Sequence, residues 1–171
     1  MSRFEHEITV DAPIREVYNQ WTQFESFPSF MEGVEKVVQG DDRTLAWTAS
    51  IAGQERSWTA VITDQTPDTR VAWKSTSGAE NAGAVLFEPA DDGRTKVTLR
   101  IDVDPEGFIE NVGDKIGAVD RQVKGDLERF KTFMETRGRA TGAWRGEIHG
   151  DEVRDPALAS TGSRPEGQDR R

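Results

Sequence analysis

An apolar stripe toward the C-terminal end is the feature that most constrains how this chain folds. Apolar side chains recur there every three or four positions, which is the spacing of one face of an α-helix. The residues of the stripe are Ile109, Val112, Ile116, Val119, Val123, Leu127, Phe130 and Met134. Asp104 is suited to cap this helix, Pro105 to its first position, and Arg137 with Gly138 to its end. About 30 residues form a helix on the order of 45 Å long. Only a large curved surface covers a stripe of that length.

The residues before this helix predict a sheet as that surface. Six runs with strand-like alternation are separated by turn residues, at 35–39, 44–51, 56–65, 70–75, 82–88 and 95–103. A seventh alternating run, 3–10, precedes Pro13 and a short helical repeat. We therefore predict an α+β fold in which one antiparallel sheet of seven strands wraps around the long helix, with short helices after the first strand.

Bulky apolar residues recur on the inward faces of the predicted strands. Three successive strands place a tryptophan there, Trp47, Trp58 and Trp73, and the next two strands place Phe87 and Ile101. Singly, each tryptophan is explained by core packing, which is the commonest use of such residues. As a set, opposite a helix that contains glycine, they favour a cavity that holds a ligand.

The long helix supplies the opposite wall of the expected cavity. Gly113 and Gly117 lie one turn apart on a flank of the stripe, and each costs about 1 kcal/mol against alanine. Either the helix approaches the sheet closely there, or the glycines leave room for a ligand. Asp120 falls on the same flank, as a polar anchor inside the cavity or as a solvated edge residue. Val112 and Ile116 complete the residues of this helix that we predict to bind a ligand.

Composition excludes several classes of function. Acidic residues outnumber basic ones by 31 to 22, and the resulting net charge of −9 opposes binding to nucleic acid or to an anionic membrane. The chain has no cysteine and only two histidines, His6 and His149, so we expect no metal site and no cofactor. The first residues lack the apolar core of a signal peptide, and no run reaches membrane-spanning length. We therefore expect a cytoplasmic protein that does not insert into a membrane.

The composition changes after Gly138. Residues 139–171 are rich in glycine, arginine and small polar residues, and their six arginines balance six acidic residues. We therefore predict a domain over 1–138 and a mostly flexible polar tail over 139–171. Within that tail, segment 143–148 carries Trp144 and Ile148, which are able to dock on the domain or to contact a protein partner.

Several short stretches resemble one known family. They are VDAPIREVY at 10–18, Trp21, FPSFMEGV at 27–34 and DLERFK at 126–131, with AWRGEI at 143–148 similar to the tail of actinobacterial members. Together they resemble the START-like superfamily, and within it the bacterial polyketide cyclase/dehydrase and coenzyme-Q-binding group. The combination of Ala-Pro with Phe-Pro-x-Phe is fairly specific.

This resemblance implies a helix-grip fold. In that fold a curved, seven-stranded antiparallel sheet wraps around the C-terminal helix, an apolar tunnel lies between them, and two short helices after the first strand close one end. FPSFMEGV would then form the cavity mouth, with Phe27, Phe30 and Met31 facing the ligand. Alternatively the same stretch is a plug that packs against the sheet, since apolar loop residues are usually anchors.

The resemblance leaves carriers and enzymes open, because one fold hosts both. The residues favour binding over catalysis, and the resemblance implies a hydrophobic small molecule that is polyketide-, quinone- or lipid-like. The first alternative is a polyketide cyclase/dehydrase, for which Asp120 is the candidate catalytic residue, because such chemistry requires a positioned acid or base. The second alternative is an interaction protein in which the cavity has collapsed and the tail is the working part.

Overall fold

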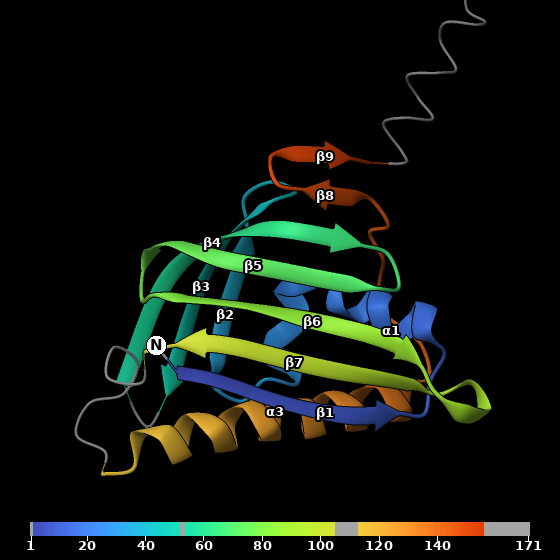
Figure 1. Ribbon diagram of the computed structural model, residues 1–171, viewed down its shortest axis with the longest axis horizontal. Helices are drawn as coiled ribbons and strands as arrows, with labels where there is room; N and C mark the ends of the chain where they lie inside the picture. Colours follow the sequence, from blue (N-terminus) through green and yellow to red (C-terminus); the bar gives the residue numbers. More distant parts are fainter. Residues whose placement is uncertain (1, 52–53, 105–112, 156–171) are drawn as a thin grey trace, which may run out of the picture.

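A computed structural model of the chain describes residues 2–51, 54–104 and 113–155 (Figure 1). The described strands are β1 (Ser2–Val10), β2 (Val34–Gln39), β3 (Thr44–Ile51), β4 (Gln54–Thr66), β5 (Arg70–Gly78), β6 (Asn81–Pro89), β7 (Thr95–Val103), β8 (Glu147–His149) and β9 (Glu152–Arg154). The helices are α1 (Ile14–Trp21) and α3 (Lys115–Arg137), with short 3₁₀ turns η1 (Phe24–Ser29) and η2 (Asp91–Gly93). No helix among these residues is long and apolar enough to cross a membrane.

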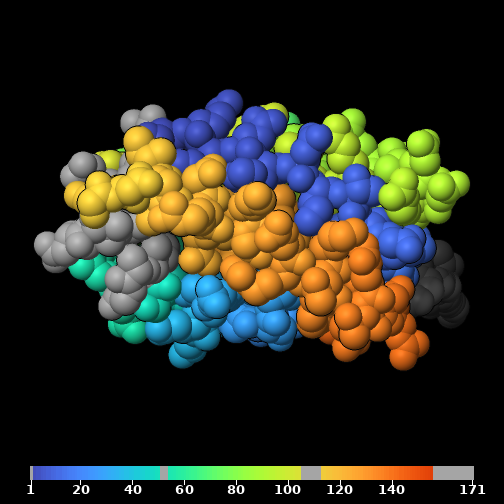
Figure 2. Space-filling view, turned by 90° about the horizontal axis from the view of Figure 1, so that it is seen from below, coloured from blue at the N-terminus to red at the C-terminus, as the bar shows by residue number. Residues whose placement is uncertain are grey.

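The strands form one antiparallel sheet in the order β1-β7-β6-β5-β4-β3-β2, with β8 paired to β4 and β9 paired to β8 (Figure 1). Hence β1 and β2 lie at opposite ends of the main path. Figure 2 shows α3, in yellow and orange, between dark-blue β1 on one side and the lighter blue segment that contains η1 and β2 on the other. The helix therefore closes the opening between the two ends of the sheet. The predicted α+β helix-grip class is confirmed, although the sheet has nine strands rather than seven.

Two short helical elements follow β1, as predicted. Pro13 precedes α1 as its N-cap, where a residue without an N–H costs nothing. η1 contains Pro28, and its last turn continues through hydrogen bonds from the Phe30 and Met31 N–H groups to the Phe27 carbonyl, 3.0 and 2.8 Å long. The stretch FPSFMEGV is therefore a tight turn whose apolar side chains are its anchors: Phe27, Phe30 and Met31 are all buried.

α3 starts at Lys115, directly after a non-helical Asp114, so the helix predicted from Asp104 does not run unbroken to its end. Asp114 caps it by accepting a hydrogen bond from the Gly117 N–H, 2.9 Å long. A Cβ atom at Gly117 would collide with this carboxylate, so the cap explains that glycine. The helix ends as predicted, with Gly138 in the left-handed conformation at φ 76°. Of the predicted first turns, 105–112 lie outside the described residues.

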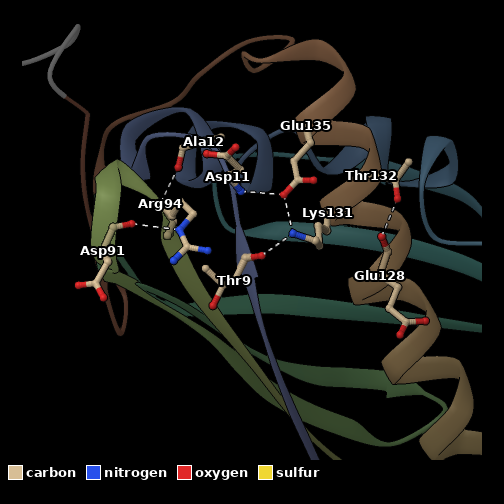
Figure 3. Close-up of polar contacts among 10 residues, drawn as sticks. Thr9, Asp11, Ala12, Asp91, Arg94, Glu128, Lys131, Thr132 and Glu135 are labelled. Carbon is tan, nitrogen blue, oxygen red and sulfur yellow. Dashed lines mark hydrogen bonds and ion pairs between the residues drawn. The ribbon is translucent and has the colours of Figure 1, made fainter.

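Polar contacts fix the C-terminal half of α3 to the end of β1 (Figure 3). The Lys131 ammonium donates a hydrogen bond of 2.8 Å to the Thr9 carbonyl and one to the Glu135 carboxylate. Glu135 in turn accepts a hydrogen bond from the Asp11 N–H, 2.8 Å long. Two neighbouring charges on one helix face thus satisfy backbone groups where β1 ends, and they set the position of α3 along the sheet.

Residues 139–155 pack against the domain, so the predicted boundary at Gly138 does not mark the end of the folded chain. Two side chains of α1 accept hydrogen bonds from backbone N–H groups of this segment. Glu16 accepts one from Ala140 and Gln20 accepts one from Thr141, at 2.9 and 2.8 Å. These hydrogen bonds hold the segment on the domain despite its low apolar content. The prediction of a flexible tail rested on that low apolar content alone. The rest of the predicted tail, 156–171, lies outside the described residues.

The segment 143–148 lies on both α1 and the sheet. The Arg145 guanidinium donates to Asn19 Oδ1 at 2.6 Å and forms an ion pair of 2.8 Å with Asp68. Ile148 lies in β8, which pairs with β4, and it is fully buried. Trp144 packs against the same core and is partly buried. The chain itself therefore covers Ile148 fully and Trp144 in part.

We expect Ile148→Ala to lower the free energy of unfolding by about 2–5 kcal/mol, the usual cost of emptying a fully buried aliphatic site. Urea unfolding monitored by circular dichroism measures this directly. Val38→Ala is the matched control, because Val38 is 43% exposed on β2 and its truncation should cost little. A loss for Ile148→Ala no larger than that of the control would show that the C-terminal segment adds nothing to the stability of the domain.

Candidate functional site

A cavity of about 140 Å³ lies between the sheet and α3. Its walls come from β3, β4, β5, β6, β7, α3 and the mouth segment, which we define as residues 27–33. Six of the residues predicted to bind a ligand line it: Phe27, Met31, Trp47, Trp58, Trp73 and Ile101. Trp21 and Phe24, which sequence reasoning did not assign to the site, add two more aromatic rings to the lining.

The tryptophans form an ordered aromatic wall. Trp47 and Trp58 face each other across β3 and β4, with ring centroids 5.7 Å apart and planes within 10° of parallel. Trp73 is fixed by a hydrogen bond of 3.1 Å from its indole N–H to Asn81 Oδ1. Phe27 packs against Trp47 at 5.7 Å, which joins the mouth segment to this wall. Aromatic faces arranged in this way suit a flat apolar ligand.

The mouth segment has both of the roles considered for it, since it faces the cavity and also packs as an anchor. Phe27 and Met31 line the cavity, whereas Phe30 does not. The Phe30 ring instead packs on Phe130 and Phe133 of α3, with centroids 5.2 and 5.1 Å away. One side of the segment therefore faces the cavity, and the other side anchors it to the helix.

Several other residues predicted for the site lie elsewhere. Phe87 packs against Tyr18 and Trp21, with centroids 5.3 and 6.3 Å away, because α1 covers that end of the sheet. Ile116 is in the first turn of α3 and is 59% exposed. Val112 lies outside the described residues.

Asp120 does not line the cavity. Its carboxylate contacts His6 Nε2 of β1 at 2.8 Å, and its side chain is 48% exposed. The apolar stripe of α3 has two flanks, and Asp120 lies with Gly117 on the flank that faces β1, whereas Gly113 precedes the helix. None of these three residues belongs to the cavity lining. The residues of α3 that do line it are Val119, Gln122, Val123 and Asp126.

Asp126 is an ionisable residue of the cavity lining that the sequence prediction missed. Its side chain is 14% exposed, and its Oδ1 atom accepts hydrogen bonds from Arg129 Nη2 at 2.6 Å and from Gln122 Nε2 at 3.1 Å. Burial raises the pKa of Asp126 from 3.8 to about 6, against the opposing effects of Arg129, Gln122 and the Glu32 backbone N–H. The available signal was its spacing, three residues after Val123 on the second flank of the stripe.

The same corner holds the mouth segment against α3. Arg129 Nε donates a hydrogen bond of 3.2 Å to the Phe30 carbonyl. Gly33 lies against the Gln122 amide: a Cβ atom there would be 3.2 Å from Gln122 Nε2 and 3.0 Å from the Ser50 carbonyl. Gly33 therefore allows the mouth segment to approach α3 closely. From the sequence, we considered such a close approach at Gly113 and Gly117 instead.

The site is an apolar, aromatic-walled cavity with one polar corner. Comparison with known proteins identifies the family to which the chain belongs. Residues 10–132 match the family model described as polyketide cyclase/dehydrase and lipid transport. The chain belongs to this family. The predicted resemblance to the polyketide cyclase/dehydrase group is thereby confirmed. No group of three or more histidine, cysteine or acidic residues able to hold a metal occurs within the described ranges.

Individual relatives support the same assignment. The chain is 52% identical over 149 residues to an uncharacterized 17.2 kDa protein in the melC2-rnhH intergenic region of Streptomyces lincolnensis, which covers 86% of this chain and 99% of that protein. A crystal structure of a Deinococcus radiodurans protein is 28% identical, with a TM-score of 0.63 over 80% of this chain and 99% of the other.

Two further solved structures share the fold. The Zhui aromatase/cyclase of a Streptomyces species has a TM-score of 0.65 at 19% identity, over 83% of this chain and 98% of its own. A START superfamily protein from Mycobacterium smegmatis has a TM-score of 0.61 at 14% identity, over 79% of this chain and 95% of its own.

The raised pKa of Asp126 predicts a specific dependence of stability on pH. The folded state retains the proton up to about pH 6, whereas the unfolded state releases it near 3.8. The contribution of Asp126 to the free energy of unfolding is therefore fully present below pH 3.8. It is lost as the pH rises toward 6, and the loss amounts to at most about 3 kcal/mol. In Asp126→Asn this loss should disappear.

Urea unfolding of both proteins at pH 4, 5, 6 and 7 measures the difference. We expect the free energy of unfolding of the wild type to fall, relative to Asp126→Asn, across this range. Parallel profiles for the two proteins would contradict the assignment of Asp126 as a buried, titrating carboxyl.

Proposed function

We propose that the protein binds a hydrophobic small molecule that is polyketide-, quinone- or lipid-like in the cavity between the sheet and α3. The aromatic wall of Trp47, Trp58 and Trp73 around an unfilled space carries this proposal. A core built for stability alone is close-packed, because each void forfeits dispersion contacts. The family description, which names both polyketide cyclases and lipid transport, supports the same class of ligand.

The size of the cavity limits what it admits without rearrangement. Its volume of about 140 Å³ is close to the roughly 150 Å³ of an apolar cavity that takes up benzene. A single ring therefore enters the cavity as it stands. A larger ligand requires the mouth segment to move, and the contacts that oppose this movement are the packing of Phe30 and its hydrogen bond with Arg129.

A second candidate function is a polyketide cyclase/dehydrase, and the observation that favours it is the position of Asp126. A carboxyl with a pKa of about 6 inside an apolar cavity is suited to general acid–base chemistry near neutral pH. In that case Asp126→Asn should abolish turnover of a polyketide substrate and leave binding of apolar aromatic compounds intact. Absence of turnover by the wild type would leave binding as the function.

Two observations count against the third alternative, an interaction protein with a collapsed cavity. Side chains do not fill the cavity, and Ile148, which was expected to dock on the domain or on a protein partner, lies in β8 and is buried in the domain. A protein partner bound through the C-terminal tail and a cytoplasmic location stay predictions. The net charge of −9 continues to favour a small molecule over nucleic acid as the partner.

Quenching of tryptophan fluorescence tests the binding proposal, because four of the five tryptophans line the cavity. Aromatic hydrocarbons of one to three rings should quench the wild type and compete with one another. Burying roughly 300 Å² of apolar ligand surface is worth about 7 kcal/mol, against association costs of at least about 4 kcal/mol. We therefore expect dissociation constants that are micromolar or weaker.

A matched pair of variants locates the binding. Ala49 is buried in the cavity wall, whereas Ala46 is exposed on the same strand. Ala49→Phe should fill the cavity and weaken quenching at least tenfold, and Ala46→Phe should bind as the wild type does. Thermal unfolding checks that both variants are folded. If a diverse set of apolar compounds neither quenches nor stabilises the wild type, the proposal is wrong.

A further inference from the structure

We propose that Asp126 accepts a hydrogen bond from a hydroxyl group of the bound ligand, so that the cavity selects neutral hydroxylated aromatic compounds over pure hydrocarbons. This inference rests on the proposed binding function and adds the chemical class of the ligand. It is carried by the position of Asp126, by its hydrogen-bonding capacity and by the charges that face it.

The first observation is the position of Asp126 in the cavity. Among the described residues that line the cavity, Asp126 is the one with an ionisable side chain. The side chain is 14% exposed, so part of it remains accessible. Asn81, another polar residue of the lining, is already engaged: its Oδ1 accepts from Trp73, and its Nδ2 donates to the Ala79 carbonyl at 3.0 Å. The Trp47 indole N–H, also in the lining, is a buried donor without a hydrogen-bond partner, so a hydroxyl group that donates its proton has its charged acceptor at Asp126.

Hydrogen-bonding capacity determines what Asp126 can still do. An ionised carboxylate offers about four acceptor positions and no donor. Three donors act on it already, from the Arg129 guanidinium, the Gln122 amide and the Glu32 backbone N–H. One acceptor position is left, and a hydroxyl group fills it by donating its proton. A ketone or quinone oxygen, which only accepts, finds no donor in the ionised group.

The charges of Asp126 and Arg129 favour a neutral ligand. The charged side chain that faces Asp126 is Arg129, from the same helix; the mouth segment contributes the backbone of Glu32, whose own side chain is exposed. Because the guanidinium already compensates the carboxylate at 2.6 Å, an ammonium ligand would be repelled by Arg129. A carboxylate ligand would be repelled by Asp126. A neutral hydroxyl avoids both costs, and the aromatic wall accepts the ring that carries it.

Toluene and phenol test this inference, because they have nearly the same shape and a single ring fits the cavity. NMR titration at pH 7 gives a dissociation constant for each compound and hence their affinity ratio. Removing the carboxylate in Asp126→Leu should lower the phenol-to-toluene affinity ratio about tenfold, the effect of one hydrogen bond to a charged group. Asp120→Asn is the matched control, since Asp120 is on the same helix but outside the cavity, and it should keep the wild-type ratio.

The dependence on pH provides a second measurement that needs no apolar substitution. The ratio in the wild type should rise between pH 5 and 7.5, because ionisation of Asp126 makes it the stronger acceptor. Phenol stays protonated over this range. Asp126→Asn should give a ratio that does not change with pH.

Each outcome separates the two proposals. If toluene binds but the ratio is the same in Asp126→Leu and in the wild type, Asp126 does not recognise a hydroxyl and the binding function stands. If Asp126→Leu does not fold, a wild-type ratio that is independent of pH overturns the inference by itself. If neither compound binds the wild type, the proposed function fails, and this inference fails with it.

Discussion

Burial of the apolar face of α3 is the interaction on which the rest of the structure depends. Val123, Leu127, Phe130 and Met134 are buried against the curved sheet, and each contributes about 1.5–3 kcal/mol through the apolar surface it removes from water. A curved sheet has two separated ends, so its concave side would stay open without the helix. α3 lies in that opening (Figure 2). Every residue of the candidate site therefore takes its position relative to this helix.

The cavity exists because the packing is complete along only part of α3. Toward the C-terminal half, Phe130 fills the space between the helix and Trp21, with ring centroids 4.7 Å apart. Nearer the N-terminal half the helix presents Val119 and Val123, which are small, and the stacked rings of Trp47 and Trp58 do not reach across to them. Tryptophan is rigid and its indole plane is fixed by its neighbours, so such a wall leaves a gap rather than collapsing into it.

The residues explain which features were predictable from sequence. Alternation with a period of two placed Trp47, Trp58 and Trp73 on inward faces, and a period near 3.6 placed Val123 and Phe130 on the buried face of α3. Periodicity identifies a stripe but not which of its flanks faces a cavity, so Asp120 was chosen and Asp126 was missed. Composition misjudged residues 139–155 for another reason. Their order depends on side chains of α1, such as Glu16 and Gln20, and no local pattern reveals partners more than 100 positions away.

Arg129 connects the chemistry of the cavity to its entrance. One guanidinium bonds both the Asp126 carboxylate and the Phe30 carbonyl, so it belongs to the polar corner and to the anchor of the mouth segment at once. A guanidinium binds an ionised carboxylate more strongly than a neutral carbonyl, so the ionised Asp126 fixes where the guanidinium lies. When Asp126 is protonated, its hydrogen bond with Arg129 weakens. The position of Phe30 and the protonation state of Asp126 are then linked through Arg129, whose hydrogen bond to the Phe30 carbonyl adds to the packing of the Phe30 ring on α3.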